Sequence, residues 1–137
     1  MLKKFLIIAM AAVMCFSLFA ITASAVDVST RDISSASKTS SLVISGTTAT
    51  CKSSYNDWQT VSKIVIVQSL EKQSFLWSWS TVGGEWTKTS TNVANVSFTN
   101  TKSGLSSGTY RVKSVFTVTL SDGTSETVTR YSNEVQI

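Results

Sequence analysis

Hydrophobic and polar residues alternate in short runs along most of the chain, and this spacing predicts an antiparallel β protein. The clearest run is residues 109–120, where apolar side chains at alternate positions share one face of a strand. Similar runs, bounded by Gly, Asn, Asp and Ser, predict further strands at about 41–45, 48–54, 61–71, 74–81, 85–90, 93–99 and 125–136. No stretch with helical periodicity follows residue 25.

The long strand at 109–120 begins a predicted hairpin. Asp122 and Gly123 favour a two-residue turn, because both residue types accept the backbone angles that such turns require. The returning strand loses its alternation between Val128 and Tyr131, which indicates a β-bulge or a strand that passes from one sheet to another. The predicted core consists of Leu42, Ile44, Cys51, Ile64, Ile66, Val96, Phe98, Leu105, Tyr110, Val112 and Phe116. Seven or eight short strands predict a sandwich of two sheets.

Three of the four tryptophans lie in the stretch FLWSWSTVGGEW, residues 75–86. Alternation and a two-residue turn at Gly83-Gly84 would place four aromatic side chains on one face of a ribbon beside Lys88: Phe75, Trp77, Trp79 and Trp86. This face either packs inward as core or forms an exposed strip that stacks on sugars or binds a protein. The candidate ligand-binding residues are therefore Trp77, Trp79, Trp86 and Lys88. Trp58 is a second candidate surface aromatic.

The first 25 residues have the pattern of an export signal. A basic start precedes an apolar run from Phe5 to Ile21, and Ala23-Ser24-Ala25 matches the site that signal peptidase cleaves. Cleavage after Ala25 predicts a secreted, extracellular protein with no membrane contact, whereas an uncleaved anchor is the alternative.

The rest of the chain is predicted to form one domain with a polar leader. Residues 26–40 are small, polar and without periodicity, which is typical of a flexible segment. Residues 41–137 form the predicted β-sandwich, since their length suits a single domain with its own core.

Composition narrows the classes of function. The chain has no histidine, so neither Ser-His-Asp nor Cys-His catalysis is available, and the usual ligands of zinc are lacking. We therefore expect no enzymatic activity, no metal and no cofactor. The net charge of +4 falls to +2 when Lys3 and Lys4 leave with the signal, and the remaining basic residues are scattered singly. This pattern gives no support to a nucleic-acid partner.

The segment GLSSGTY, residues 104–110, resembles the tyrosine corner of immunoglobulin-like domains, with a glycine two residues before Tyr110 at the start of a long strand. The resemblance implies an antiparallel immunoglobulin-like β-sandwich in which the ring of Tyr110 is buried and its hydroxyl binds the backbone. In antibody domains the second disulfide cysteine follows that tyrosine by two residues. Val112 stands there in this chain, so the resemblance implies that Cys51 packs against Val112 without a disulfide. An intermolecular disulfide through Cys51 is the alternative.

The chain is also similar to small, uncharacterised secreted proteins of Gram-positive anaerobic bacteria, through its export signal, its richness in Ser and Thr, and the segment SGLSSGTYRVK. This resemblance implies no activity. The predicted function is a secreted, non-enzymatic binding or interaction module for a cell-envelope glycan or a partner protein. A passive structural or adhesive surface protein and a bacteriocin-like secreted effector are the alternatives.

Overall fold

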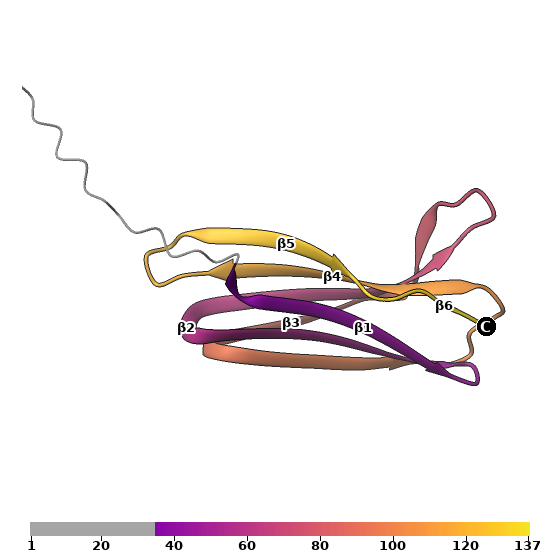
Figure 1. Cartoon of the computed structure of the whole chain (residues 1–137), viewed down its shortest axis with the longest axis horizontal. Helices are drawn as coiled ribbons and strands as arrows, with labels where there is room; N and C mark the ends of the chain where they lie inside the picture. The colour runs from indigo at the N-terminus through magenta and orange to yellow at the C-terminus, as the bar shows by residue number, and fades with distance from the viewer. Residues whose placement is uncertain (1–34) are drawn as a thin grey trace, which may run out of the picture. The chain divides into compact units, whose positions relative to one another are not determined.

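The computed structural model describes residues 35–137, which are almost all antiparallel β structure without an α-helix (Figure 1). The strands are β1 (Ser37–Ser45), β2 (Thr48–Gln73), β3 (Trp79–Lys102), β4 (Thr109–Thr119), β5 (Ser125–Tyr131) and β6 (Val135–Gln136). Because β1 begins at Ser37, residues 37–40 of the predicted leader belong to the folded part. The predicted signal peptide, residues 1–25, and the leader up to residue 34 lie outside the described residues. No helix within the described range is long and apolar enough to cross a membrane.

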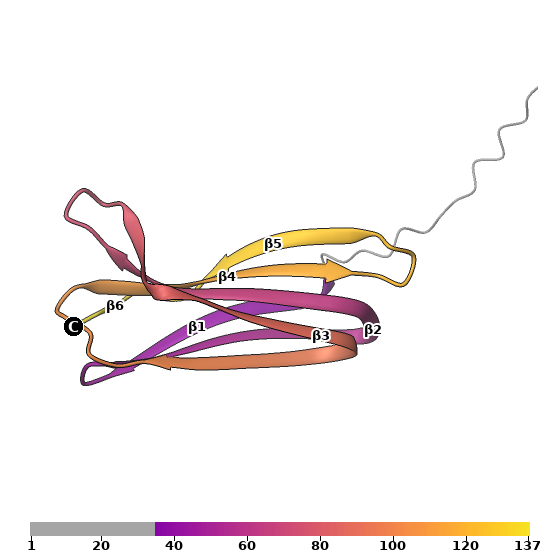
Figure 2. The same ribbon diagram turned by 180° about the vertical axis from the view of Figure 1, so that it is seen from behind.

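Strands β2 and β3 are long because each of them folds back once. The first limb of β2, residues 48–56, pairs with β1 and with the end of β3. The second limb of β2, residues 61–73, pairs with the start of β3 and with β4. The predicted strands at 48–54 and 61–71 are therefore the two limbs of one strand. Figures 1 and 2 show β2 and β3 turning over together at one end, opposite the hairpin that joins them.

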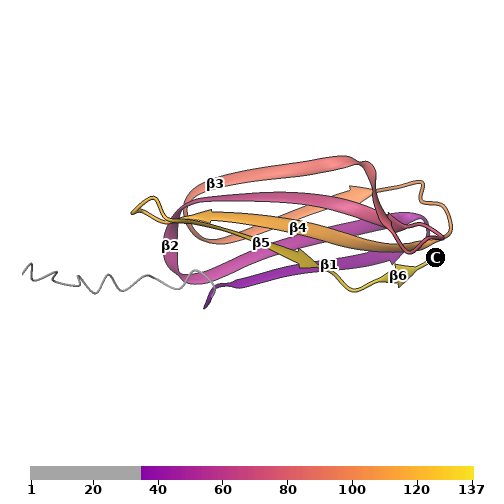
Figure 3. The same ribbon diagram turned by 90° about the horizontal axis from the view of Figure 1, so that it is seen from above.

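This folding produces two layers of strands from one continuous six-stranded sheet, in place of the seven or eight short strands in two separate sheets that the sequence predicted. One layer contains β1, the first limb of β2 and the end of β3, and the other contains the second limb of β2, the start of β3, and β4, β5 and β6. Figure 3 looks onto the second layer, with β4 and β5 towards the viewer. Since alternate side chains of both layers point into the space between them, the core lies there.

Polar side chains and backbone geometry define the folded-over ends. In β2 the carboxylate of Asp57 accepts hydrogen bonds from the hydroxyl of Tyr55 at 3.0 Å and from the backbone N–H of Gln59 at 3.2 Å. In β3, Asn92 has a φ of 54°, a left-handed conformation that asparagine tolerates better than most residues. Tyr55 itself is buried.

Two apolar clusters fill the core, one around Tyr55 and Phe116 and the other around Leu70 and Tyr110. The predicted core residues found buried are Leu42, Cys51, Ile64, Ile66, Val96, Leu105, Tyr110, Val112 and Phe116. Ile44 and Phe98 are partly buried against the clusters. The hydrophobic alternation therefore identified the inward faces of the strands correctly.

A chain of hydrogen-bonded polar side chains, three of them buried and two partly buried, also crosses the core. Asn100 donates from Nδ2 to Oε1 of Gln68 at 2.8 Å, and Gln68 donates from Nε2 to Oγ of Ser53 at 2.6 Å. The hydroxyl groups of Ser53 and Ser114 are 2.7 Å apart, and Ser114 donates to Ser40 at 2.9 Å. Successive members belong to opposite layers, so these hydrogen bonds tie the layers together.

The C-terminal strands agree with two expectations in part. The chain reverses after β4 as predicted, but Leu120 N–H bonds to the carbonyl of Thr124, which leaves a three-residue loop instead of a two-residue turn. Asp122 Oδ1 accepts the Thr124 N–H at 2.8 Å, and this bond lowers the pKa of the carboxyl group. The predicted irregularity between Val128 and Tyr131 is not found there, because β5 pairs regularly with β4 through Tyr131. The irregularity lies at residues 132–134, between β5 and β6. Both strands pair with β4, so the chain bulges without changing sheet.

Candidate binding surface at the β2–β3 hairpin

The hairpin joining β2 to β3 turns at residues 74–78, a different place from the one predicted. Gly83 and Gly84 lie inside β3, where residues 82–84 stand opposite the single residue Leu70 of β2. Their φ angles of 80° and 102° suit a β-bulge, in which a strand gains residues and bends. Figures 1 and 2 show the hairpin rising from the layer of β4 and β5, on the side that faces away from β1.

Three consecutive apolar side chains occupy the tip of this hairpin. Phe75 is 90% exposed, Leu76 is 71% exposed and Trp77 is 80% exposed. The tip is nevertheless ordered by short hydrogen bonds, since the N–H of Ser74 donates to the carbonyl of Ser78 at 2.7 Å and the two serine hydroxyls are 2.7 Å apart. Trp77 has a φ of 62°, a left-handed conformation that bulky residues rarely adopt.

An arginine is stacked between two aromatic rings at the base of the hairpin. The guanidinium carbon of Arg111 lies 4.0 Å from the ring centroid of Trp79 and 4.0 Å from that of Tyr131. Arg111 Nε also donates to Oε2 of Glu71 at 2.8 Å, and both side chains are mostly buried. These contacts hold the start of β3 against β4 and β5, so the hairpin has a fixed base.

The other two candidate ligand-binding residues lie apart from the tip. Trp86 is half-buried and packs against the core cluster that contains Leu70. Lys88 donates from Nζ to the carbonyl of Ser97 at 2.9 Å and lies over the ring of Phe98. The predicted single aromatic face beside Lys88 therefore does not form, because it depended on a turn at Gly83-Gly84. Of the candidate tryptophans, Trp77 is exposed, Trp79 is stacked and Trp86 is partly in the core.

The residues predicted to have structural roles lie close to their expected positions. Tyr110 is buried, and its hydroxyl donates to the carbonyl of Ser106 at 2.6 Å, as the tyrosine-corner resemblance implied. Cys51 is a buried free cysteine in the same apolar cluster as Val112. Burial raises the pKa of the Cys51 thiol from 9.0 to about 11, because an apolar setting disfavours the thiolate.

Trp58 is the other strongly exposed tryptophan, as the sequence suggested. It is 81% exposed and lies where β2 folds back, between the pairings of Asn56 and Val61. The β2–β3 hairpin begins at the opposite end of the second limb of β2. Trp58 therefore provides an exposed aromatic residue remote from the hairpin tip.

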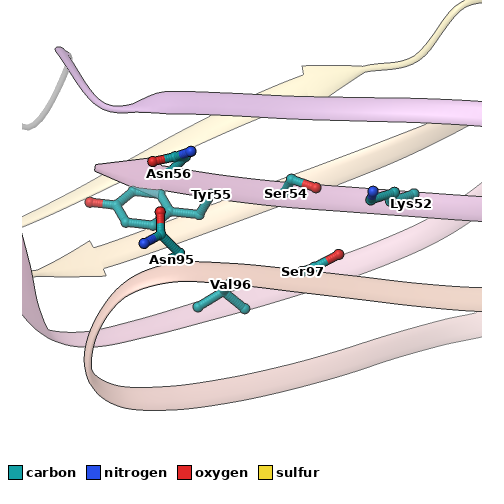
Figure 4. Close-up of a pocket in the computed structure, with 7 residues that line it drawn as sticks. All are labelled: Lys52, Ser54, Tyr55, Asn56, Asn95, Val96 and Ser97. Atoms are coloured by element: carbon teal, nitrogen blue, oxygen red, sulfur yellow. The ribbon is translucent and has the colours of Figure 1, made fainter. Parts of the chain in front are cut away.

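A shallow hollow of about 290 Å³ lies beside the first limb of β2 (Figure 4). Its lining residues are Lys52, Ser54, Tyr55, Asn56, Asn95, Val96 and Ser97. The amide side chains of Asn56 and Asn95 lie at either side of the Tyr55 ring in the close-up. The lining contains no carboxylate and no thiol. No group of three His, Cys, Asp or Glu side chains in residues 35–137 could hold a metal ion.

The fold defines the chain as an antiparallel β domain, and comparison adds little to that class. No protein-family model and no curated protein matches the chain. Among solved structures, the E. coli curli protein CsgC is similar at 19% identity and a TM-score of 0.41, over 69% of this chain and 97% of that one. Wild-type OgpA from Akkermansia muciniphila is similar at 11% identity and a TM-score of 0.36, over 74% of this chain and 30% of OgpA. At these identities and TM-scores the similarities carry no information on function.

Proposed function

We propose that the protein is a secreted, non-enzymatic interaction module whose binding surface is the projecting β2–β3 hairpin. The observation that carries this proposal is the exposure of Phe75, Leu76 and Trp77 at the tip. Large apolar side chains gain free energy when they leave water, and contiguous exposed ones usually mark interaction sites. The ligand is a component of a cell envelope, such as a glycan, or a partner protein.

An immunoglobulin-like sandwich is the proposed scaffold for this surface. Three features support it: two facing layers of strands, the hydroxyl bond of Tyr110 to the backbone, and the burial of Cys51 and Val112 in one cluster. In such a scaffold the connections at the ends of the strands carry binding residues, while the packed layers hold them in place. The β2–β3 hairpin is a connection of this kind.

The stack around Arg111 supports a role for the hairpin in binding. Arg111 of β4 contacts Trp79 and Glu71 of the hairpin strands and Tyr131 of β5, so these contacts join the hairpin to β4 and β5 before any ligand arrives. A surface that is already ordered loses little conformational entropy when it binds. The tip is therefore prepared for contact without a folding step.

The proposal of a non-enzymatic, secreted protein rests mainly on the sequence. The chain has no histidine, and its first 25 residues have the pattern of an export signal. The described residues add a hollow lined by amides, hydroxyls and Lys52, a set suited to weak polar contacts.

Binding of envelope material by matched variants tests the proposal. We expect the protein and its Trp58→Ser variant to bind bacterial envelope fragments or cell-surface protein equally, and a Phe75→Ser, Trp77→Ser double variant to lose that binding. Full binding by the double variant would show that the hairpin is not the surface. Absence of binding to any envelope fraction or surface protein would favour a passive structural protein, and killing of neighbouring bacteria would favour a bacteriocin-like effector.

A further inference from the structure

We propose that the tip of the β2–β3 hairpin, residues 74–78, inserts into the interfacial region of an anionic lipid bilayer. Phe75, Leu76 and Trp77 would enter the boundary between headgroups and acyl chains. This step rests on the proposed function, because it uses the same hairpin, and it identifies the envelope component as a lipid surface.

The shape of the tip favours a bilayer over a sugar or a protein. The hairpin projects from the rest of the fold (Figures 1 and 2). Phe75, Leu76 and Trp77 are consecutive exposed residues in its turn, so together they form a small convex surface. A sugar site is usually a concave surface with convergent hydrogen-bonding groups. A stable protein interface usually buries about 800 Å² on each partner, an area that calls for more than three side chains. A bilayer interface requires neither a matching shape nor directed hydrogen bonds.

Three N–H groups and both serine hydroxyls of the turn are bonded within the hairpin, which lowers the cost of leaving water. The N–H of Ser74 donates to the carbonyl of Ser78, and the N–H of Trp77 donates to the carbonyl of Ser74 at 3.1 Å. The N–H of Leu76 donates to the hydroxyl of Ser74 at 3.3 Å, and that hydroxyl also bonds to the hydroxyl of Ser78. Backbone groups that enter a low-dielectric region must keep their hydrogen bonds, and these bonds remain intact on insertion.

Basic side chains flank the base of the hairpin, where lipid headgroups would lie. Lys72 comes two residues before the turn and donates from Nζ to the hydroxyl of Ser106. Lys102 lies against Gly83 in the bulge of β3. Within residues 35–137, neither ammonium group is in an ion pair. Both can therefore attract the negative surface of an anionic membrane.

The backbone of Trp77 gives an independent indication. A tryptophan at a φ of 62° is strained relative to glycine, yet its ring is 80% exposed and adds little to packing. The fold itself gains nothing from this side chain that a glycine would not provide. The value of the ring therefore lies in a contact outside the folded chain.

The sequence analysis predicted no membrane contact after cleavage of the signal. A tip that enters only the interface requires no span, so the inference replaces that expectation. Tryptophan and phenylalanine are well suited to this depth because their rings are stable between headgroups and acyl chains.

The experiment uses protein purified after expression of the full chain, mixed with phosphatidylglycerol–phosphatidylcholine vesicles or with pure phosphatidylcholine vesicles. We expect sedimentation with the anionic vesicles and a blue shift of tryptophan emission. The Phe75→Ser, Trp77→Ser variant should bind about tenfold more weakly or worse, since each ring buries enough apolar surface for a change of that size. Trp58→Ser, which changes an equally exposed tryptophan at the point where β2 folds back, should bind as strongly as the unchanged protein.

Two results would overturn the inference: no binding to anionic vesicles, or undiminished binding by the double variant. Equal binding to neutral vesicles would refute the anionic preference. The protein could fail to bind vesicles and still bind peptidoglycan or a surface protein in a manner that depends on Trp77. That result would refute the lipid inference and leave the proposed function standing. If the double variant binds every partner normally, both fail. Because the substituted side chains are exposed, circular dichroism and thermal unfolding should show an unchanged fold.

Discussion

The hydroxyl oxygens of Ser53 and Ser114 lie 2.7 Å apart in the middle of the core, and both side chains are fully buried. Each belongs to a different layer of strands. With Gln68, Asn100 and Ser40 they form a continuous series of hydrogen bonds between the two apolar clusters. A buried polar group is tolerated only when it has a partner, so these residues favour the one alignment of layers that brings them together.

Replacement of Gln68 by methionine should destabilise the protein by about 1–3 kcal/mol, because Ser53 and Asn100 would each lose a buried or partly buried hydrogen-bond partner. Urea denaturation followed by circular dichroism measures the change. The control is Gln136→Met on the exposed side of β6, for which we expect a change within about 0.5 kcal/mol. Equal stability of the two variants would show that the polar series does not hold the layers together.

Tyr110→Phe should cost about 1–3 kcal/mol, since it removes the buried hydroxyl that donates to the carbonyl of Ser106. Tyr131→Phe is the matched control, because its ring is 50% exposed. Thermal or urea unfolding of both variants compares the effects. A loss no larger than that of the control would remove the main support for the immunoglobulin-like scaffold.

Cys51 should make stability fall between about pH 9 and pH 11. Burial raises the pKa of this thiol from 9.0 to about 11 in the folded chain, so the unfolded chain loses its proton first as pH rises. The contribution of Cys51 to the free energy of unfolding is fully present below pH 9 and is lost as pH rises through 11. The loss is about 2–3 kcal/mol for a pKa shift of this size. Cys51→Ala lacks the titrating group, so the difference between the two pH profiles isolates the effect. Profiles that run parallel would contradict it.

The same burial predicts that Cys51 is unreactive in the folded protein. A thiol reagent should label it slowly under native conditions and quickly in denaturant. Rapid native labelling would contradict the prediction, and a disulfide-linked dimer on a non-reducing gel would support the intermolecular alternative.

Trp77→Gly should be more stable than Trp77→Ala by about 1 kcal/mol. The left-handed backbone at this position is unfavourable for alanine, whereas glycine adopts it without a penalty. Urea unfolding of the two variants provides the measurement. The reverse order would mean that the turn relaxes to a negative φ. Both variants lack the ring, so both should lose binding if the hairpin tip is the binding surface.

The alternation along β4 predicted the inward face of that strand, and Tyr110, Val112 and Phe116 are buried as expected. This part of the fold could be predicted from the sequence because the two-residue period of a strand is a local property. The hydrogen bond from the Tyr110 hydroxyl to the Ser106 carbonyl could also be predicted from the sequence, since the two residues are only four positions apart.

The position of the hairpin turn could not be predicted from the sequence in the same way. Gly83-Gly84 is a good local turn signal, but β3 pairs with β2 through that point and the chain turns at residues 74–78. Register between two strands depends on how all their side chains fit the two layers, and a bulge can accommodate glycines that would otherwise form a turn. The error changed the predicted neighbours of the tryptophans and of Lys88.

The sequence by itself determined that the chain forms strands, which of their faces are apolar, and which catalytic chemistries lack the necessary residue types. Tertiary structure decided the different environments of three tryptophans: Trp77 is exposed, Trp79 is stacked on Arg111 and Trp86 lies against the core. It also decided that Gln68 and Ser114 are buried, with partners 32 and 61 residues away. Alternation is set by neighbouring residues, whereas the exposure of a ring and the partner of a polar group depend on segments that meet only when the two layers close.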